Sequence, residues 1–341
     1  MRDLREPAPG RRRRPRRHRP AHLRELIAAV SSAVLAAAAL TARTDDKDSD
    51  TPPTAQTSAA ATVDAGQDAA TVLAANKAVH SDGSVHLHGV ALTAASGDDG
   101  VHAEDALRID AGRVTITGSN EGLEAAHIAV AGGTASVTSS DDGVNGSGES
   151  EGDSEGGGGG EQVGDFDVTV SGGTLIINAD GDGLDSNGTA SITGGTVVVN
   201  GPTERNNGAL DVNGAFTISG GILIAAGSSG MPVAPGTDST QAWLSATLAS
   251  TVPAGTTLYV TDANGKPLAT FVTSKDMQNL VYSSSTLTKD GKYTIYSGGK
   301  ASGTSTGGLS ASGTLGSAKK LTTVTAGVAP EGGFGGRRPG R

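Results

Sequence analysis

The chain has no cysteine, and this absence excludes disulfide bonds and any metal or nucleophilic site built on a thiolate. Aromatic residues make up only 3% of its 341 residues, so a buried core must consist mainly of aliphatic side chains. Glycine, in contrast, occurs 52 times. This composition argues against an ordinary helical or α/β enzyme and favours a repetitive β architecture.

Common catalytic motifs are also missing. The sequence contains no nucleophile elbow, no P-loop and no zinc-binding His-Glu helix motif. A pectate-lyase-like enzyme would need a basic residue beside the substrate carboxylate, and only Arg108 and Arg113 lie on the repeated strands described below. Neither falls among the repeated acidic residues. We therefore predict a protein that is not an enzyme, and keep a pectic lyase or hydrolase, with Arg108 as the base of the lyase, as an alternative.

The net charge of −10 conceals two opposite parts of the chain. Residues 1–43 hold 11 of the 26 Lys and Arg residues but only 3 of the 36 Asp and Glu residues. The remainder holds 15 basic and 33 acidic residues, a balance of −18. Such an acidic surface favours cations and disfavours nucleic acid and anionic membranes as partners.

The basic part has the pattern of an export signal. The segment RRRRPRRHRP precedes an apolar run from Ile27 to Leu40, which is short for a transmembrane span and ends in small residues. A basic nucleic-acid patch is the rival interpretation. Leu40–Arg43 (LTAR) resembles a lipoprotein box that lacks its cysteine. We predict a signal segment at 1–42 that is cleaved without lipidation, and a secreted or cell-surface protein with no membrane insertion afterwards.

A Thr-, Ala- and Asp-rich segment at 43–80 is predicted to be a disordered linker. After it, five segments repeat one pattern around the turn glycines Gly100, Gly122, Gly143, Gly183 and Gly208. Their spacing is about 21 residues once an acidic, Gly-rich insert at 146–164 is removed from the longest interval. A constant period of roughly 20–25 residues with β content indicates a solenoid.

Four apolar columns support this alignment. Members of a column recur at the same place in successive repeats and alternate with polar residues, as expected for strands with one buried face. The columns are Leu107, Ile128, Val168, Ala190 and Phe216; Ile109, Val130, Val170, Ile192 and Ile218; Val114, Ala135, Leu175, Val197 and Leu223; and Ile116, Val137, Ile177, Val199 and Ala225. We predict an all-β fold, a right-handed parallel β-helix of about five or six coils over residues 81–235.

Residues 240–300 differ from the repeats in composition. They contain the single tryptophan, all four tyrosines and two hairpin signals, Asn264-Gly265 and Asp290-Gly291. We predict a small C-terminal β unit that covers the exposed end of the solenoid, followed by a flexible tail at 301–341.

Acidic and amide side chains fall into two rows along one edge of the predicted solenoid. The turn row, just before each turn glycine, consists of Asp99, Glu121, Asp142, Asp182 and Asn207. The strand row, just after it, consists of His102, Glu124, Asn145, Asp185 and Asp211. Stacked coils lie about 4.8 Å apart, and Ca²⁺ binds oxygen at about 2.3–2.6 Å, so one ion reaches two coils. We predict Ca²⁺ ligands at Asp99, Glu121, Asp142, Asp182, Glu124, Asn145, Asp185 and Asp211.

Turn formation is the alternative explanation for any single repeat, because Asp-Gly and Asn-Gly are favoured turn dipeptides whose side chains bind backbone amides. Against it, unpaired acids in a row repel one another by about 1 kcal/mol per pair in water and roughly 4 kcal/mol at an effective dielectric constant of 20. The remaining polar features are interpreted as structural. The insert is taken as a solvated loop, and His86, His88 and His127 as surface or strand residues without partners at ligand spacing.

The repeats DDGV, GDGL and SGGTL, followed by STVPAGTTLYVTDANGKPLATF and YTIYSGG, resemble the bacterial secreted carbohydrate-binding β-helix family over about residues 82–299. This resemblance implies a parallel β-helix that holds calcium and binds acidic plant polysaccharide such as polygalacturonate, without established catalysis. It maps the acidic coil-edge positions onto Asp99, Glu121, Asp142, Asp182, Glu124 and Asp185. The chain departs from that pattern at His102, Asn145 and Asn207.

The scarcity of aromatic residues fits this expectation. Coils between residues 98 and 227 contain only Phe166 and Phe216, so sugar rings have few platforms on which to stack. A polyanion could bind so acidic a surface only through bridging cations. We expect calcium-dependent binding of acidic plant or cell-wall polysaccharide, and keep a calcium-stiffened adhesin or cell-wall structural protein as the first alternative.

Overall fold

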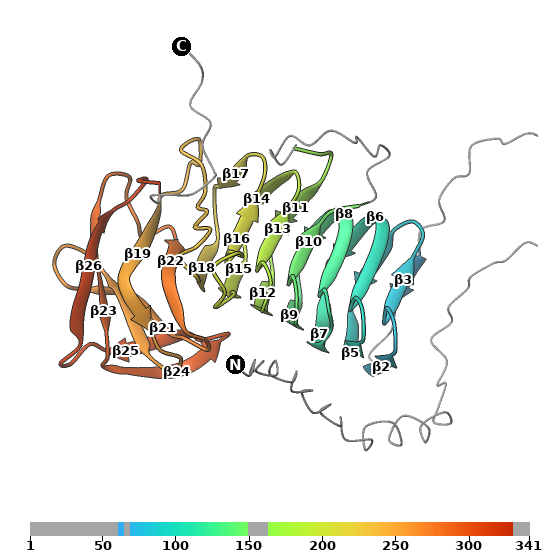
Figure 1. Ribbon diagram of the computed structural model, residues 1–341, viewed down its shortest axis with the longest axis horizontal. Helices are drawn as coiled ribbons and strands as arrows, with labels where there is room; N and C mark the ends of the chain where they lie inside the picture. Colours follow the sequence, from blue (N-terminus) through green and yellow to red (C-terminus); the bar gives the residue numbers. More distant parts are fainter. Residues whose placement is uncertain (1–60, 65–68, 149–162, 330–341) are drawn as a thin grey trace, which may run out of the picture. The chain divides into compact units, whose positions relative to one another are not determined.

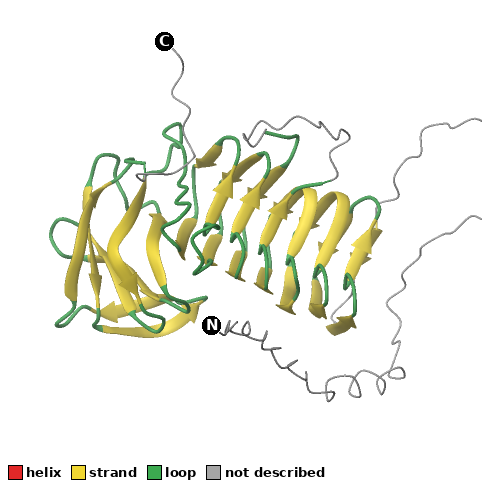
Figure 2. Ribbon diagram, in the orientation of Figure 1, coloured by secondary structure: helices red, strands yellow, loops and turns green. Residues whose placement is uncertain are grey.

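The computed structural model describes residues 61–64, 69–148 and 163–329, and these residues form only strands, turns and loops (Figure 2). No helix in this part of the chain is long and apolar enough to cross a membrane. The predicted signal segment at 1–42, the lipobox-like Leu40–Arg43 and residues 149–162 of the acidic insert lie outside the described residues.

The repeats form a β-solenoid of about seven coils, with two parallel-stranded sheets (Figure 1). The predicted all-β parallel solenoid is therefore confirmed, although it has more coils than the five or six expected. Each complete coil contributes one strand segment to each of three faces. The faces are named here by the order in which a coil passes through them after its turn glycine.

Face 1 and face 2 belong to one sheet, and the long strands β6 and β8 run through both. Between Ala103 and Ala106 the register of β6 against β8 shifts, which marks the bend between the faces. Face 1 contains β3 (Val79–Ser81), the first parts of β6 (Val101–Ile109) and β8 (Leu123–Val130), β10 (Val144–Gly146), β13 (Leu184–Ser186) and β16 (Leu210–Val212). Face 2 contains β1 (Ala61–Asp64), β4 (Val85–His88), the second parts of β6 and β8, β11 (Asp167–Val170), β14 (Thr189–Ile192) and β17 (Phe216–Ile218).

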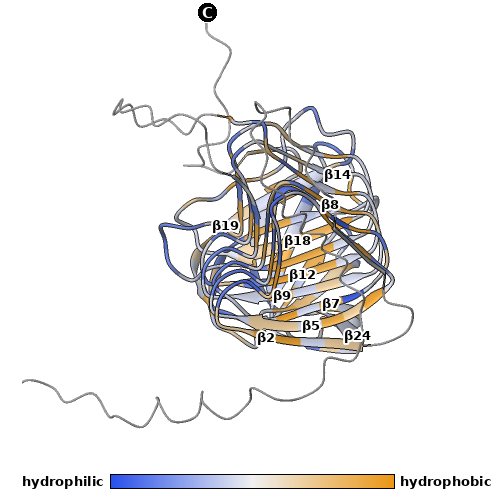
Figure 3. Ribbon diagram, turned by 90° about the vertical axis from the view of Figure 1, so that its right-hand side faces the viewer, coloured by the Kyte–Doolittle hydropathy of each residue, from blue (hydrophilic) through white to orange (hydrophobic). Residues whose placement is uncertain are grey.

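Face 3 is a separate parallel sheet. It contains β2 (Ala69–Ala74), β5 (Val90–Ser96), β7 (Gly112–Gly118), β9 (Thr134–Ser139), β12 (Thr174–Ala179), β15 (Thr196–Asn200) and β18 (Ile222–Gly227). The view along the stacked coils shows strands of this face coloured mainly as hydrophobic (Figure 3).

The predicted linker at 43–80 is wrong where the structure describes it. Strand β2 pairs in parallel with β5, with Val72 beside Ala94, and β3 pairs with β6. The Ala- and Thr-rich sequence of β2 shows little apolar periodicity. Neighbouring coils supply the backbone partners that order it, so the solenoid begins before residue 81.

All four predicted apolar columns are confirmed. Successive members pair directly, as Leu107 does with Ile128, Val168 with Ala190, and Ala190 with Phe216. Every member is at most 4% exposed. Because each aliphatic side chain stacks on its equivalent in the next coil, the interior is a continuous aliphatic core that requires little aromatic packing.

The Gly-Gly pairs mark the corner between faces 2 and 3. Gly173 and Gly195 both have positive φ, at 71° and 76°. A Cβ on Gly195 would lie 2.7 Å from the carbonyl oxygen of Gly172 in the preceding coil. Both the backbone conformation and the close stacking of coils therefore require glycine at this corner.

A C-terminal β unit ends the solenoid. Strand β22 pairs antiparallel with β18 of face 3, and β19 pairs with β22, so the last parallel strand has no open edge. The other strands form a six-stranded antiparallel sheet. The unit consists of β19 (Trp243–Val252), β20 (Thr257–Thr261), β21 (Pro267–Val272), β22 (Met277–Ser283), β23 (Lys292–Ser297), β24 (Lys300–Thr306), β25 (Leu309–Thr314) and β26 (Lys319–Thr325).

The predicted flexible tail at 301–341 is wrong for its first part, because β24, β25 and β26 lie within it. These strands are rich in Ser, Thr and Gly and lack a strong apolar alternation. Polar contacts join them to the sheet instead. The buried Tyr259 donates its hydroxyl to the carbonyl oxygens of Lys300 and Thr314, at 2.8 and 2.9 Å.

Candidate cation-binding site

The strand row is in register along face 1. His102 pairs with Glu124, Glu124 with Asn145, Asn145 with Asp185, and Asp185 with Asp211. These residues come from β6, β8, β10, β13 and β16, whose inward neighbours belong to the aliphatic core. The alternation of the strands thus holds five polar side chains in a line on the outside of the solenoid.

The turn row also stacks, but two of its carboxylates, those of Asp142 and Asp182, bind backbone amides of the following coil. Oδ1 of Asp142 accepts a hydrogen bond from the amide of Asp182 at 2.7 Å, and Oδ1 of Asp182 accepts one from the amide of Gly208 at 2.5 Å. This is the turn role that the dipeptide preference suggested. One oxygen of each carboxylate is occupied in this way.

The last coil differs from the sequence alignment by one residue. The amide of Gly143 binds the carbonyl of Asp182, whereas the amide of Gly183 binds the carbonyl of Gly208. Gly208 therefore occupies the place expected for Asn207, and Ala209 that of the turn glycine. The wide turn before this coil contains an additional residue, which the glycine spacing did not reveal.

At the N-terminal end of the rows, basic side chains neutralise the acids. The carboxylate of Asp99 is only 2% exposed and contacts both the Lys77 ammonium and, at 3.1 Å, Nδ1 of His102. The same His102 nitrogen lies 2.6 Å from Oε2 of Glu124. Hydrogen bonds to Asp99 and Glu124 raise the pKa of His102 to about 10, so the imidazole is protonated at neutral pH. Lys77 lies in the segment predicted to be a linker.

The pKa of Asp99 reflects this pairing. Burial acts to raise it, but the hydrogen bonds from His102 and Lys77 outweigh burial and hold the pKa of this carboxyl below its usual range. Its charge is therefore balanced by the protein itself. This arrangement argues against Asp99 as a Ca²⁺ ligand.

The central acids lack such partners. Within the described residues, no ion pair involves Glu121, Asp142 or Asp182. Burial, together with repulsion from neighbouring carboxylates, raises the pKa of Glu121 to about 7, that of Asp142 to about 6 and that of Asp182 to about 7. A bound cation would reverse this unfavourable electrostatic environment.

Asn145 lies at the centre of the strand row and is only 8% exposed. Its Nδ2 donates a hydrogen bond to Oε2 of Glu121 at 3.0 Å, but its Oδ1 is buried without a hydrogen-bond partner. An unsatisfied buried amide oxygen costs roughly 1–3 kcal/mol. Amide oxygens are ordinary Ca²⁺ ligands, so the residue type and its environment suit an ion at this point.

The two rows do not bring all predicted ligands into one tight group. In the described part of the chain, two sets of three metal-capable side chains have ligand atoms within 4.8 Å of one another, namely Asp99, His102 and Glu124, and His86, His88 and Asp110. Neither set contains Asp142, Asp182, Asp185 or Asp211. The Ca²⁺ hypothesis for these four residues therefore requires their side chains to move closer together than the structure places them.

The histidines outside the rows do have partners, so their interpretation as unpartnered residues is wrong. Nε2 of His86 lies 2.6 Å from Oδ2 of Asp110, and Nδ1 of His127 lies 2.6 Å from Oδ1 of Asp167. Each partner belongs to the next coil, so the interval in sequence exceeds that of a local motif. The sequence feature that could have indicated these partners is the His86-Leu87-His88 spacing, with the acid Asp110 one coil later.

Arg108 does not join the acid rows. It lies on face 2, where its Nη2 is 2.6 Å from Oδ1 of Asp110. The geometry therefore gives no support to its role as a lyase base beside a Ca²⁺ ion on face 1.

The chain was compared with family models, curated proteins and solved structures. No family model, curated protein or solved structure matches it.

Proposed function

We propose that the protein is a secreted or cell-surface binder of acidic polysaccharide, such as polygalacturonate, and that Ca²⁺ held along face 1 bridges the two. The observation that carries this proposal is the central group of acids. Glu121, Asp142 and Asp182 stand in successive coils, half-buried and without an ion pair in the described chain. Asn145, whose Nδ2 contacts Glu121, has a buried Oδ1 without a hydrogen-bond partner.

Electrostatics favours a cation over a direct polymer contact. The chain beyond residue 43 has a balance of −18, so a polyuronate would be repelled by the bare protein. A divalent ion that binds the carboxylates of both partners removes this repulsion. The coil repeat of about 4.8 Å places potential ligands periodically along face 1, in the direction that a linear polymer would follow. The family resemblance in the repeat motifs points to the same ligand class.

Affinity electrophoresis in gels that contain polygalacturonate tests the proposal. With Ca²⁺ present we expect the full chain to be retarded, and with chelator the retardation should disappear. The double variant Asp142→Asn/Asp182→Asn should run without retardation under both conditions. Asp105→Asn is the matched control, since this exposed carboxylate on β6 lies outside both rows and should leave retardation intact.

A structural role for calcium is the second candidate, favoured by the amide contacts of Asp142 and Asp182 across the coil interface. Under that role, Ca²⁺ would raise the melting temperature without changing mobility in the polysaccharide gel. Unchanged mobility and melting temperature with and without Ca²⁺ would refute both candidates. Release of unsaturated uronides during long incubation would indicate a lyase instead.

A further inference from the structure

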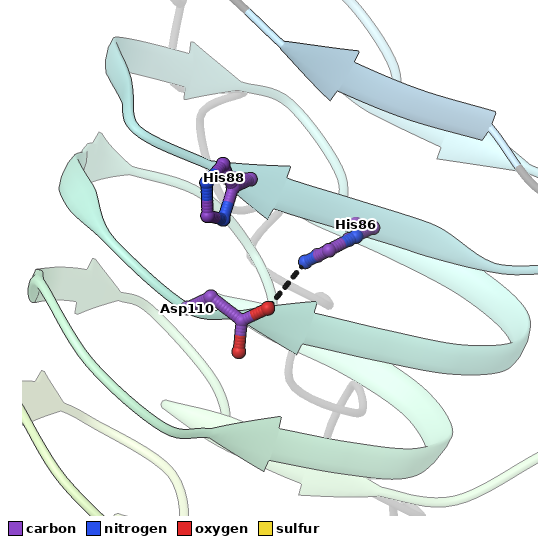
Figure 4. Close-up of side chains that lie close together, drawn as sticks. All are labelled: His86, His88 and Asp110. Carbon is purple, nitrogen blue, oxygen red and sulfur yellow. Dashed lines mark hydrogen bonds and ion pairs between the residues drawn. The ribbon is translucent and has the colours of Figure 1, made fainter.

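A second polar cluster lies on face 2, apart from the acid rows. His86 and His88 project from the same side of β4, because strand residues two apart share a face, and Asp110 follows β6 in the next coil (Figure 4). The ligand atoms of the three side chains lie within 4.8 Å of one another. The two imidazole rings are 5.8 Å apart and inclined by 61°.

We propose that His86, His88 and Asp110 form a binding site for a divalent transition metal ion of the zinc type. Two imidazole nitrogens and one carboxylate oxygen are ligands that Zn²⁺ prefers, whereas Ca²⁺ prefers oxygen alone. The site is thus chemically distinct from the acid rows and does not depend on the proposed polysaccharide binding. Because His88 is exposed, a fourth position remains open to water or another ligand.

The surroundings of Asp110 support this assignment. Arg108 binds its Oδ1 at 2.6 Å and leaves Oδ2 directed toward Nε2 of His86. Hydrogen bonds from outside the coordination sphere commonly orient metal ligands in this way. The positive charge of Arg108 repels a cation, so the ligand bonds themselves must supply the affinity.

Only modest rearrangement is required. Tetrahedral Zn²⁺ with bonds of about 2.0–2.1 Å separates its ligand atoms by roughly 3.4 Å. The contact of 2.6 Å between His86 and Asp110 would therefore open slightly as the ion replaces the shared hydrogen. His88, which is exposed and lies at the end of β4, would turn inward by a rotation of its side chain.

His127 and Asp167 provide an internal comparison. Their contact is also 2.6 Å, and the pair bridges β8 and β11 on face 2. No third metal-capable side chain joins this pair within 4.8 Å among the described residues. If an ordinary His-Asp hydrogen bond were the whole function of His86, both pairs should respond equally to metal.

Titration calorimetry of the full chain without a polyhistidine tag tests the proposal, with Zn²⁺ as the probe and excess Ca²⁺ present to occupy hard oxygen sites. We expect one Zn²⁺ per chain. His88→Ala and Asp110→Asn should each weaken binding at least tenfold. His127→Ala should bind as the unchanged chain does, and all variants should retain the circular dichroism spectrum of the folded protein.

Co²⁺ substitution gives an independent readout. A four-coordinate site with two imidazoles should produce intense visible absorption that is absent in His88→Ala. The proposal would be overturned by unchanged Zn²⁺ affinity in His88→Ala or Asp110→Asn, by equal loss of affinity in His127→Ala, or by an unmodified chain that binds no Zn²⁺. Because His88 is exposed, its replacement should not unfold the protein.

Discussion

The N-terminal end and the centre of the acid rows differ in how the negative charge of the carboxylates is balanced. Around Asp99, the side chains of Lys77 and His102 supply positive charge from within the protein. Around Asp142 and Asp182, the described residues supply only backbone amides and further acids. Both clusters lie on coils that stack in the same register, so the difference shows that a repeated backbone can hold either a self-neutralised cluster or a cluster of acids without an ion pair among the described residues.

The largest expected effect comes from removing the internal cations. In Lys77→Ala/His102→Ala, the buried Asp99 carboxylate loses both partners, and we expect the free energy of unfolding to fall by about 3–5 kcal/mol. Denaturant unfolding measures this loss. Lys275→Ala, which breaks the partly exposed pair with Asp180, is the control and should cost less than about 1 kcal/mol. Equal effects of the two changes would contradict the distinction drawn here.

The central acids should respond in the opposite direction. Without calcium at pH 8, Asp142→Asn/Asp182→Asn removes like-charge repulsion while each amide oxygen can still accept its backbone hydrogen bond. We expect stabilisation by about 1–2 kcal/mol, or a rise in melting temperature of roughly 2–8 °C for a domain of this size. Added Ca²⁺ should stabilise the unchanged chain and not the variant. A destabilised, calcium-responsive variant would show that the carboxylates serve mainly in turns.

A smaller effect should appear in the pH dependence of the calcium-free protein. Glu121, Asp142 and Asp182 have pKa values of about 7, 6 and 7 in the folded state, above their usual values of about 4. Between about pH 4 and 7, these carboxyls have lost their protons in the unfolded chain but keep them in the folded chain. Their contribution to the free energy of unfolding therefore falls as the pH rises from about 4 to 7. Thermal melts should show this slope, and the double Asn variant should flatten it.

His102 contributes to the pH dependence of stability in a different, more alkaline range than the central acids. Because its pKa is raised to about 10, its contribution is complete below about pH 6.5 and is lost as pH rises toward 10. His102→Ala should therefore flatten the curve between about pH 6.5 and 10. A change confined to the region between pH 4 and 6 would contradict the assigned pairing.

Much of the fold could be predicted from the sequence because its cause is local and repeated. Aliphatic residues at every second position, as in Leu107 and Ile109, define the buried face of each strand, and the coil period stacks them. The pairing of Glu124 with Asn145 follows from the same register. Beyond this, the strands β24 to β26 escaped prediction because their sequences lack a strong apolar alternation, and backbone pairing of β26 with β23 and hydrogen bonds from Tyr259 to β24 and β25 hold them.

The partners of the site were harder to predict. Lys77 reaches Asp99 from the preceding coil, and Asp110 reaches His86 from the following one, so neither pair is a sequence motif. Their association becomes visible only when the coil boundaries are known to the residue. The displacement of Asn207 by Gly208 shows that a single additional residue in a turn changes which side chain occupies a site.

The way in which β22 closes the last strand of face 3 has a consequence for growth of the molecule. Among the described strands, those of the C-terminal β unit pair with the solenoid only at β18, while side-chain contacts from Asn200 to Gly307 and from Lys275 to Asp180 reach the two coils before it. A duplicated coil placed between the coils of β7 and β9 would leave these contacts untouched and add one rung to each acid row. Length is thus a quantity that duplication or design can change stepwise without remaking either end, and under the proposed function it would set the number of simultaneous attachments to a long polymer.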